Sequence, residues 1–544
     1  MNRDAAVLPD ISDYQRLAAS FQWRIPARFN MGVAVSDVWA ATEPDRPAIL
    51  DLRGGDALET LTFGALAERS SRLAHALMLA GVARGDRVAI LLPQMAAVVV
   101  AHVAIYKLGA VALPLASLFG VDALEYRLAD AGVRALITDA PGLAKVATIR
   151  AQLPQLDVLI STDGPDGAVL GFAQILERGS PTFPAADTGP DDPALMIYTS
   201  GTTGPPKGAL HAHRVLLGHL PGVQFPHEGF PKAGDRFWTP ADWAWAGGLL
   251  NVLLPSLYFG VSVVARRFDR FDPEAALHLM ARMEVRNAFI PPTALRMLRA
   301  IHAAGRRYNV DLRTLASGGE SLGAETYAWG REAFGLTINE FYGQTECNLV
   351  LASNNAIGVS RAGAIGKAVP GHDCDVIRPD GTRCEADEPG QIAVLRPDPV
   401  MFLGYWNNEK ATEAKFIGDW MTTGDQGRRD ADGYVFFFGR DDDVITSSGY
   451  RIGPGEIEDC LLRHPAVEIS AAVGKPDAIR GEIVKAFIVP KPGFQPSADL
   501  AADIQSFVRT RLSAHEYPRE VAFIDRLPLT TSGKVIRREL RARG

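Results

Sequence analysis

One short segment combines glycines, hydroxyl side chains and a lysine in a way that suits phosphate binding. Residues 198–208 read Tyr-Thr-Ser-Gly-Thr-Thr-Gly-Pro-Pro-Lys-Gly and directly follow the apolar run 194–197. Glycines let the backbone approach a ligand closely, and successive peptide N–H groups in such a loop can form a nest for anions. The hydroxyls add donors and Lys207 adds a positive charge, so we predict a loop that holds a polyphosphate.

This loop is not a Walker A loop. That motif needs a lysine followed by Ser or Thr at the start of a helix, whereas Lys207 follows a proline and precedes Gly208. An ordinary turn rich in glycine and threonine is the alternative interpretation.

Further polar motifs follow along the chain. Residues 317–321 (Ser-Gly-Gly-Glu-Ser) and 340–346 (Glu-Phe-Tyr-Gly-Gln-Thr-Glu) each follow an apolar, strand-like stretch. Residues 422–425 (Thr-Thr-Gly-Asp) precede an Asp-Gly hairpin, residues 447–454 precede a helical pattern, and residues 530–534 (Thr-Thr-Ser-Gly-Lys) lie near the C-terminus. Any one of these strings alone would be weak evidence.

The composition indicates a globular protein of more than one domain. A chain of 544 residues is too long for one core, and 47% hydrophobic and 22% charged residues are ordinary for a soluble protein. The net charge of −7, without a long basic run, argues against nucleic acid as a partner. Four scattered cysteines without a CxxC pair suit a reducing compartment and indicate no zinc site or disulfide framework.

Neither a signal peptide nor a membrane span is predicted. The first ten residues lack an apolar core, and the most apolar stretch, 95–106, stops at Lys107. It is well short of the ~20 residues that a span needs, so we interpret it as a buried helix and expect a cytoplasmic protein.

Strand and helix patterns alternate through the first three quarters of the chain. They predict an α/β fold: a large N-terminal domain of parallel-rich sheets covered by helices, with ligands at the carboxyl ends of strands. Beyond about residue 370, short β-rich runs between Asp-Gly and Pro-Gly turns indicate a β-rich subdomain. A small mobile α+β domain follows, and we predict the domains 1–439 and 440–544.

In this order, the motifs resemble the core motifs of the adenylate-forming enzymes, and specifically the medium-chain and acetyl-CoA synthetase branch. The resemblance covers nearly the whole chain. It implies that a carboxylic acid attacks the α-phosphorus of ATP to give an acyl-adenylate and pyrophosphate, and that coenzyme A then takes the acyl group. The partners implied are the acid, ATP and CoA, and a homodimer is among the assemblies that the resemblance allows.

The resemblance also implies a nucleotide site and a magnesium ligand. Glu346 would help to hold Mg²⁺, and Thr345 would contact the α-phosphate region. Asp425 would accept hydrogen bonds from the ribose, assisted by Arg440. The ATP- and AMP-binding residues implied are Thr199, Ser200, Gly201, Thr202, Thr203, Gly204, Lys207, Gly319, Glu320, Glu340, Phe341, Tyr342, Gly343, Gln344, Thr345, Asp425, Arg440 and Arg451.

Catalysis and movement are implied for the small domain. Lys534 would stabilise charge while the carboxylate attacks, and with Thr345 and Glu346 it forms the catalytic set; taken alone, Lys534 reads as an exposed surface lysine. Asp442 would be the hinge on which the domain rotates, although a charged surface turn is compatible with the same residues. The CoA-binding residues implied are Ser448, Gly449, Tyr450, Arg480 and Tyr517.

Residues 238–249 resemble the acyl-binding segment of that branch. Two tryptophans, Trp243 and Trp245, stand two positions apart and cannot share one helical face. The glycines Gly247 and Gly248 would either open a tunnel for the acid or allow close helix packing. We predict Trp243, Gly247, Gly248 and Gly343 as acyl-binding residues.

Gly343 stands where acetyl-specific relatives carry a tryptophan, and an acid larger than acetate, medium-chain or aromatic, is the resulting hypothesis. Loading of a carrier protein in trans is the alternative function, and a non-catalytic nucleotide-binding protein is the alternative class. We expect His211 and His213 to be structural or helix-capping residues and Cys347 to be a buried packing thiol.

Overall fold

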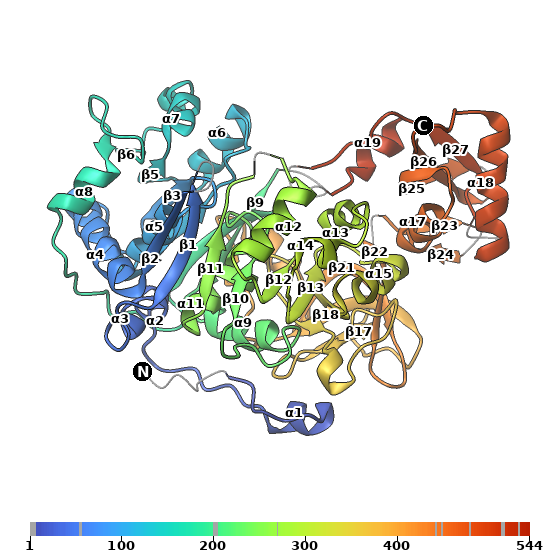
Figure 1. Cartoon of the computed structure of the whole chain (residues 1–544), viewed down its shortest axis with the longest axis horizontal. Coiled ribbons are helices and arrows are strands. Elements are labelled where there is room, and N and C mark those ends of the chain that lie inside the picture. Colours follow the sequence, from blue (N-terminus) through green and yellow to red (C-terminus); the bar gives the residue numbers. More distant parts are fainter. Residues whose placement is uncertain are drawn as a thin grey trace.

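The chain folds into a large N-terminal part and a small C-terminal part beside it (Figure 1). The computed structural model describes residues 7–53, 57–199, 205–268, 270–440, 443–447, 450–477, 480–512, 517–530 and 534–543, apart from the side chains at 446, 450, 451, 456 and 481. Within these residues, no helix combines the length and the apolar character that crossing a bilayer requires.

The first sheet carries the strands that flank the predicted phosphate loop. Its order in the described part is β19-β9-β8-β4-β3-β5-β6-β7. The bounds are β3 (Arg87–Leu91), β4 (Val111–Pro114), β5 (Ala135–Thr138), β6 (Val158–Ser161), β7 (Leu170–Gly171), β8 (Pro193–Thr199), β9 (Lys207–Ala212) and β19 (Gly404–Tyr405). Strands from β8 through β7 pair in parallel, whereas β9 is antiparallel to both β8 and β19.

The second sheet brings two polar motifs to one edge. Its order among the described residues is β16-β15-β14-β13-β12-β10-β11-β1-β2. The bounds are β1 (Pro47–Arg53), β2 (Ala57–Thr62), β10 (Arg236–Trp238), β11 (Ser262–Ala265), β12 (Asn287–Phe289), β13 (Thr314–Gly318), β14 (Ile338–Tyr342), β15 (Leu351–Ala352) and β16 (Lys367–Ala368). Because β13 and β14 are parallel neighbours with Gly318 opposite Phe341, residues 317–321 and 340–346 leave the sheet side by side.

Helices separate and cover these two sheets. Apolar residues of α4 (Phe63–Leu79), α5 (Ala96–Leu108), α9 (Val215–Gln224) and α11 (Leu254–Tyr258) fill the core between them. The outer face of the first sheet is covered by α6 (Val121–Asp130) and α7 (Ala140–Ala147), and that of the second by α12 (Pro273–Arg282), α13 (Pro292–Arg299) and α15 (Ala324–Phe334). The remaining helices of this part are α1 (Tyr14–Ser20), α2 (Met31–Val35), α3 (Asp37–Ala40), α8 (Phe172–Arg178), α10 (Ala246–Gly248), α14 (Ala304–Tyr308) and α16 (Glu409–Glu413).

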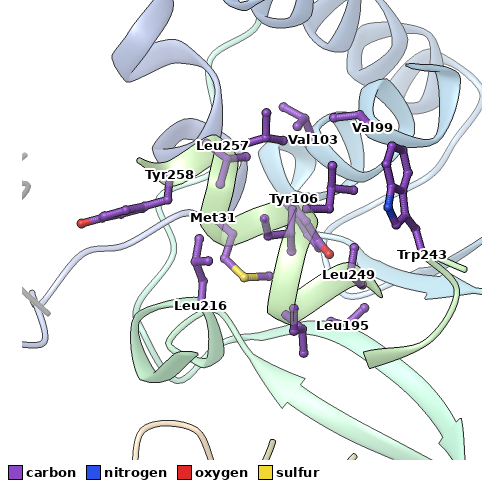
Figure 2. Close-up of a cluster of buried hydrophobic side chains, with 14 of the residues drawn as sticks. Met31, Val99, Val103, Tyr106, Leu195, Leu216, Trp243, Leu249, Leu257 and Tyr258 are labelled. Carbon is purple, nitrogen blue, oxygen red and sulfur yellow. The ribbon is translucent and has the colours of Figure 1, made fainter. Parts of the chain in front are cut away.

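The core is centred on α5. Every residue of this helix is buried, and Gly109, with φ of 73°, ends it in the left-handed conformation that glycine adopts without strain. Figure 2 shows Val99, Val103 and Tyr106 of α5 among Met31, Leu195, Leu216 and Leu249. The apolar run 95–106 is therefore a core helix, as its length predicts.

Two smaller sheets follow. The third has the path β17-β18-β21-β20 with β22 beside β21, formed by β17 (Cys374–Ile377), β18 (Pro389–Leu395), β20 (Phe416–Ile417), β21 (Trp420–Arg429) and β22 (Val435–Arg440). The fourth lies in the small part, with the path β24-β23-β26-β25 and β27 beside β26; its strands are β23 (Ile445–Ser447), β24 (Tyr450–Ile452), β25 (Val467–Asp477), β26 (Gly481–Pro490) and β27 (Glu520–Phe523). Helices α17 (Pro454–Leu462), α18 (Ala498–Arg511) and α19 (Arg537–Ala542) accompany it.

The predicted fold class is confirmed, including the β-rich subdomain and the α+β C-terminal part. The division at 439/440 stays a prediction; β22 of the third sheet ends at Arg440, and the next described strand, β23, begins at Ile445.

Candidate functional site

The centre of the candidate site is a buried carboxylate, Asp425, on β21. Its Oδ2 accepts hydrogen bonds from the Tyr342 hydroxyl at 2.5 Å and from Gln344 Nε2 at 2.7 Å. Arg440 Nη1, at the end of β22, lies 3.7 Å from its Oδ1. Burial raises the pKa of Asp425, while Arg440 and the two donors lower it. Three strands thus bring together residues that the sequence places up to about a hundred positions apart.

The ends of β13 and β14 lie beside Asp425. Gly319 has φ of 93°, and a Cβ at this position would meet no atom within 4 Å, so the backbone here borders open space. The Glu320 carboxylate turns away to accept from Thr293 Oγ1 at 2.8 Å and from Arg296 Nη2 at 2.7 Å. Backbone groups at 319–320 are therefore exposed toward the space next to Tyr342.

Glu340 and Phe341 lie on β14, close to its end. Burial raises the pKa of Glu340 to about 8, and the charge of Asp459 on α17 adds to the effect. Its Oε1 accepts the Leu322 N–H at 3.3 Å. The Phe341 ring packs against Phe289 with their centroids 5.0 Å apart.

The predicted phosphate-binding residues that the structure describes stand at the end of β8 and the start of β9. Thr199 and Lys207 stand opposite each other in the β8–β9 pair, while Ser200, Gly201, Thr202, Thr203 and Gly204 lie outside the described residues. The Lys207 ammonium lies 5.2 Å from the ring centroid of Tyr405 on β19. The Tyr405 hydroxyl donates in turn to Glu346 Oε1, and burial raises the pKa of this tyrosine. Thr345 is half-buried, and among the described residues its hydroxyl has no partner.

The carboxylate of Glu346 fits the predicted role as a magnesium ligand. Its Oε2 has no donor in the described part of the chain and is not fully buried, so a hard cation can reach it. Within that same part, no group of three or more His, Cys, Asp and Glu side chains could hold a metal by itself. Mg²⁺ typically binds one or two carboxylates together with substrate phosphates, and a single carboxylate agrees with that pattern.

Lys534 is exposed and lies next to the antiparallel bridge between Leu529 and Val535. Its N–H donates to Thr530 Oγ1 at 3.0 Å, and its carbonyl accepts from the Thr530 N–H at 2.7 Å. Arg537, at the start of α19, is oriented by ion pairs to Glu458 and Asp443. Burial alone would lower the pKa of Arg537, but Glu458, Asp443 and, from the large domain, Glu320 raise it. Arg537 therefore lies within electrostatic reach of the 317–321 motif, and Figure 1 shows α19 on the side of the small domain that faces the large one.

The other small-domain predictions are not tested. Asp442, Ser448 and Gly449 lie outside the described residues, as do the side chains of Tyr450 and Arg451, whose backbone forms β24. The Arg480 N–H donates to Asp477 Oδ1 at 2.8 Å, and the Tyr517 hydroxyl accepts from Arg519 Nη1 at 3.0 Å. These contacts belong to the small domain itself and leave the CoA roles as predictions.

The acyl-binding predictions need correction. Trp243 is only 1% exposed and packs in the core beside α5 (Figure 2), whereas Trp245 stays half-buried against Phe119, with 5.7 Å between ring centroids. The two tryptophans thus point to different environments, as their spacing predicts. The one that keeps accessible surface is Trp245.

Two of the predicted acyl-site glycines do not face empty space. A Cβ at Gly248 would lie 2.5 Å from the Asp242 carbonyl oxygen, and one at Gly343 would lie 2.1 Å from the Leu349 backbone nitrogen. In both places neighbouring backbone occupies the volume that a side chain would need, so the size argument drawn from Gly343 is not supported. At Gly247 a Cβ would lie 3.1 Å from the Phe289 ring, so this glycine allows close approach to an aromatic side chain.

Sequence reasoning missed Tyr405 and Lys415. Lys415 Nζ donates to the Thr422 carbonyl at 3.0 Å and lies 3.4 Å from Gln344 Oε1, which helps to orient Gln344. Neither residue stands in a distinctive local pattern, and both reach the site through sheet pairing. His213 Nδ1 accepts the N–H of Met31 at the start of α2, in agreement with the structural role predicted for it.

Comparison with known proteins agrees with this arrangement. The family model described as AMP-binding enzyme matches residues 36–406, and that of the AMP-binding enzyme C-terminal domain matches residues 456–534. The chain is 33% identical to the acyl-coenzyme A synthetase ACSM2B, mitochondrial, of Homo sapiens, over 97% of this chain and 93% of that protein. It is 33% identical to the acetyl-coenzyme A synthetase of Bacillus subtilis (strain 168), over 89% and 85%. Its fold matches the crystal structure of the anthranilate CoA ligase AuaEII in complex with anthranoyl-AMP, with a TM-score of 0.86 and 29% identity over 95% of this chain and 98% of that one.

Proposed function

The chain belongs to the family of AMP-binding enzymes, as an acyl-CoA synthetase, and from this premise we propose that it joins a medium-chain fatty acid or an aromatic acid to coenzyme A. The observation that carries the proposal is the convergence of Tyr342, Gln344 and Arg440 on the buried Asp425. A carboxylate fixed in this way, at the edge where β13 and β14 end, suits the hydroxyls of a ribose.

Two bond exchanges make up the reaction. A carboxylate oxygen of the acid attacks the α-phosphorus of ATP, and the bond to pyrophosphate breaks. The CoA sulfur then attacks the acyl carbon, the bond to AMP breaks, and the thiol loses its proton. The first step brings two anions together, so it depends on neutralising charge and on positioning more than on acid–base chemistry.

The chain's own residues supply those functions in this proposal. Lys207 and the loop before it bind the phosphates, and Lys534 places its charge at the attacking carboxylate and the α-phosphate. Glu346, through its free Oε2, would hold Mg²⁺, which when bound would supply neutralisation of phosphate charge. Rotation of the small domain about Asp442 then brings CoA-binding residues to the same place.

The preference for a larger acid rests on the aromatic residues beside Gly247. Phe289 lies against Gly247, and Phe341 of β14 packs on Phe289; both rings are buried and form an apolar wall beside β14. Such a wall suits an alkyl chain or a flat ring better than the two carbons of acetate. Similarity to an anthranilate CoA ligase supports an aromatic acid, and similarity to a mitochondrial acyl-coenzyme A synthetase supports an acyl substrate in general.

A pyrophosphate-release screen tests the proposal. The purified protein is given ATP, Mg²⁺ and CoA with straight-chain, branched and aryl acids, and pyrophosphate and acyl-CoA are both measured. We expect turnover with medium-chain or aromatic acids and little with acetate. Pyrophosphate that forms equally without CoA, with no acyl-CoA product, would instead indicate loading of a carrier protein. Absence of pyrophosphate with every acid would refute the proposal.

A further inference from the structure

Glu346 has one carboxylate oxygen engaged and one free. Oε1 accepts a hydrogen bond from the Tyr405 hydroxyl, whereas Oε2 has no donor in the described part of the protein and keeps accessible surface. A carboxylate without such a partner can turn about its terminal bond and present either oxygen or both. The contact with Tyr405 therefore selects which oxygen remains for a ligand.

The segment around Tyr405 holds Glu346 at two points. The Phe402 N–H donates to the Glu346 backbone carbonyl at 2.8 Å, and the Tyr405 hydroxyl holds its side chain. Tyr405 is itself fixed, because it pairs with Ala209 of β9, its N–H donates to Thr412 Oγ1 at 2.8 Å, and its ring packs on Phe402 with centroids 5.0 Å apart. The hydroxyl that reaches Glu346 thus comes from a rigid support.

Tyr405 also stands between two opposite charges. The Lys207 ammonium lies over its ring, and no ion pair joins Lys207 to Glu346 in the part of the chain that the structure describes. The aromatic face of Tyr405 attracts the Lys207 ammonium. The Tyr405 hydroxyl occupies the Glu346 oxygen that this ammonium could otherwise approach. Both charges are thereby kept available for a phosphate and its cation.

We propose that Tyr405 is a positioning residue that presents a single Glu346 oxygen to the divalent cation of the nucleotide and keeps Lys207 from pairing with that carboxylate. This inference rests on the proposed function, in which Glu346 holds Mg²⁺. Partners that orient a metal ligand typically change metal affinity about 10- to 100-fold when they are removed.

The variant Tyr405→Phe separates this role from simple packing, because it keeps the ring on Phe402 and under Lys207 and removes only the hydroxyl. Binding of ATP is measured by calorimetry with Mg²⁺ and, separately, with EDTA. We expect about tenfold weaker binding in Mg²⁺ and unchanged binding in EDTA, and a Mg²⁺ half-saturation for pyrophosphate release that rises by a similar factor. Tyr434→Phe is the matched control, since its hydroxyl donates to the Gly358 carbonyl and does not touch Glu346.

Two outcomes would overturn the inference: unchanged Mg²⁺ dependence in Tyr405→Phe, or an equal loss of ATP binding with and without Mg²⁺. Glu346→Gln separates a failure of this inference from a failure of the proposed function. If Glu346→Gln responds to Mg²⁺ like the wild type, Glu346 does not bind the metal and the proposed metal site is wrong. Thermal unfolding checks that Tyr405→Phe is folded. If it is not, Thr412→Val, which removes the acceptor of the Tyr405 N–H, should shift Mg²⁺ dependence in the same direction by a smaller factor.

Discussion

At the scale of single residues, Asp425 shows how a buried charge is tolerated where a ligand must be recognised. Transfer of an isolated carboxylate out of water is costly unless it is hydrogen-bonded or paired. Tyr342 and Gln344 both donate to Oδ2, so the other oxygen, beside Arg440, is the one that a sugar hydroxyl can approach. Glu346 likewise has one oxygen that accepts from Tyr405 and one that has no donor in the part of the chain the structure describes.

The change Asp425→Ala is expected to raise the KM for ATP about tenfold or more, because a hydrogen bond to a charged group contributes about 1.5–3 kcal/mol. Steady-state pyrophosphate release with ATP and with 2′,3′-dideoxy-ATP checks the cause. The wild type should prefer ATP, and the variant should have lost that preference. Asp373→Ala, at an exposed carboxylate paired with Arg383, is the control and should behave as the wild type. A variant that still discriminates would place the ribose elsewhere.

At the scale of elements, the approach of α17 to Gly323 brings carboxylates of the two domains within electrostatic reach of each other. Glu340 lies under the Leu322 N–H, and a Cβ at neighbouring Gly323 would come within 2.7 Å of Asp459 Oδ1. Burial raises the pKa of Asp459 to about 6, with Glu458 adding to the effect and Arg296 opposing it. Glu340 and Asp459 can therefore lie this close without charge repulsion mainly while Glu340 is protonated and neutral.

The free energy of unfolding should therefore fall as the pH rises. The folded-state pKa of Glu340, about 8, lies above the ordinary value of 4.5, so the native protein keeps a proton that the unfolded chain releases. The stabilising contribution is complete below the ordinary pKa and is lost as the pH rises through the folded one. The side chain of Glu340→Gln stays neutral, so this variant is expected to lose less stability than the wild type as the pH rises. Thermal unfolding measured between about pH 5 and about pH 9 checks this expectation.

The control for this experiment is Glu413→Gln at the exposed end of α16. It should show the same dependence of the thermal midpoint on pH as the wild type. If Glu340→Gln and Glu413→Gln were indistinguishable, the proton on Glu340 would contribute nothing to stability.

At the scale of the whole molecule, α19 of the small domain comes within electrostatic reach of the large domain. Lys534 precedes α19 by a few residues, and the charge of Glu320 in the large domain acts on Arg537 at the start of that helix. Glu458 and Asp443 hold Arg537 from the small-domain side. Arg537 at the start of α19 is thus influenced by charges of both domains, while the placement of Lys534 at the nucleotide stays a prediction.

Replacement of Lys534 by Ala should lower acid-dependent pyrophosphate release by about two to three orders of magnitude, since one charged donor to the reacting oxygens is lost. Thioester formation from supplied acyl-adenylate and CoA should be largely spared. The two half-reactions are measured separately, and Arg538→Ala, an exposed cation on α19, serves as the control. Equal loss of both half-reactions would remove the role assigned to Lys534.

The elements and the polar motifs could be predicted from the sequence because both depend on residues close together in the chain. The length and apolar character of the run 95–106 predict a buried helix, which is found as α5, and the alternation of strand and helix patterns predicts the parallel-rich sheets that are found. The candidate residues Asp425, Glu346 and Lys534 stand in short strings whose chemistry is readable locally.

Contacts between segments far apart in the chain were decided only by the tertiary structure. Tyr405 reaches Glu346 across 59 positions, and Tyr342 reaches Asp425 across 83, through strand pairings whose register no local pattern specifies. Packing likewise decided that backbone fills the volume beside Gly343 and Gly248 and that Trp243 belongs to the core. A glycine in a sequence shows that a side chain is absent, but only the neighbouring chain determines whether that absence leaves space for a ligand.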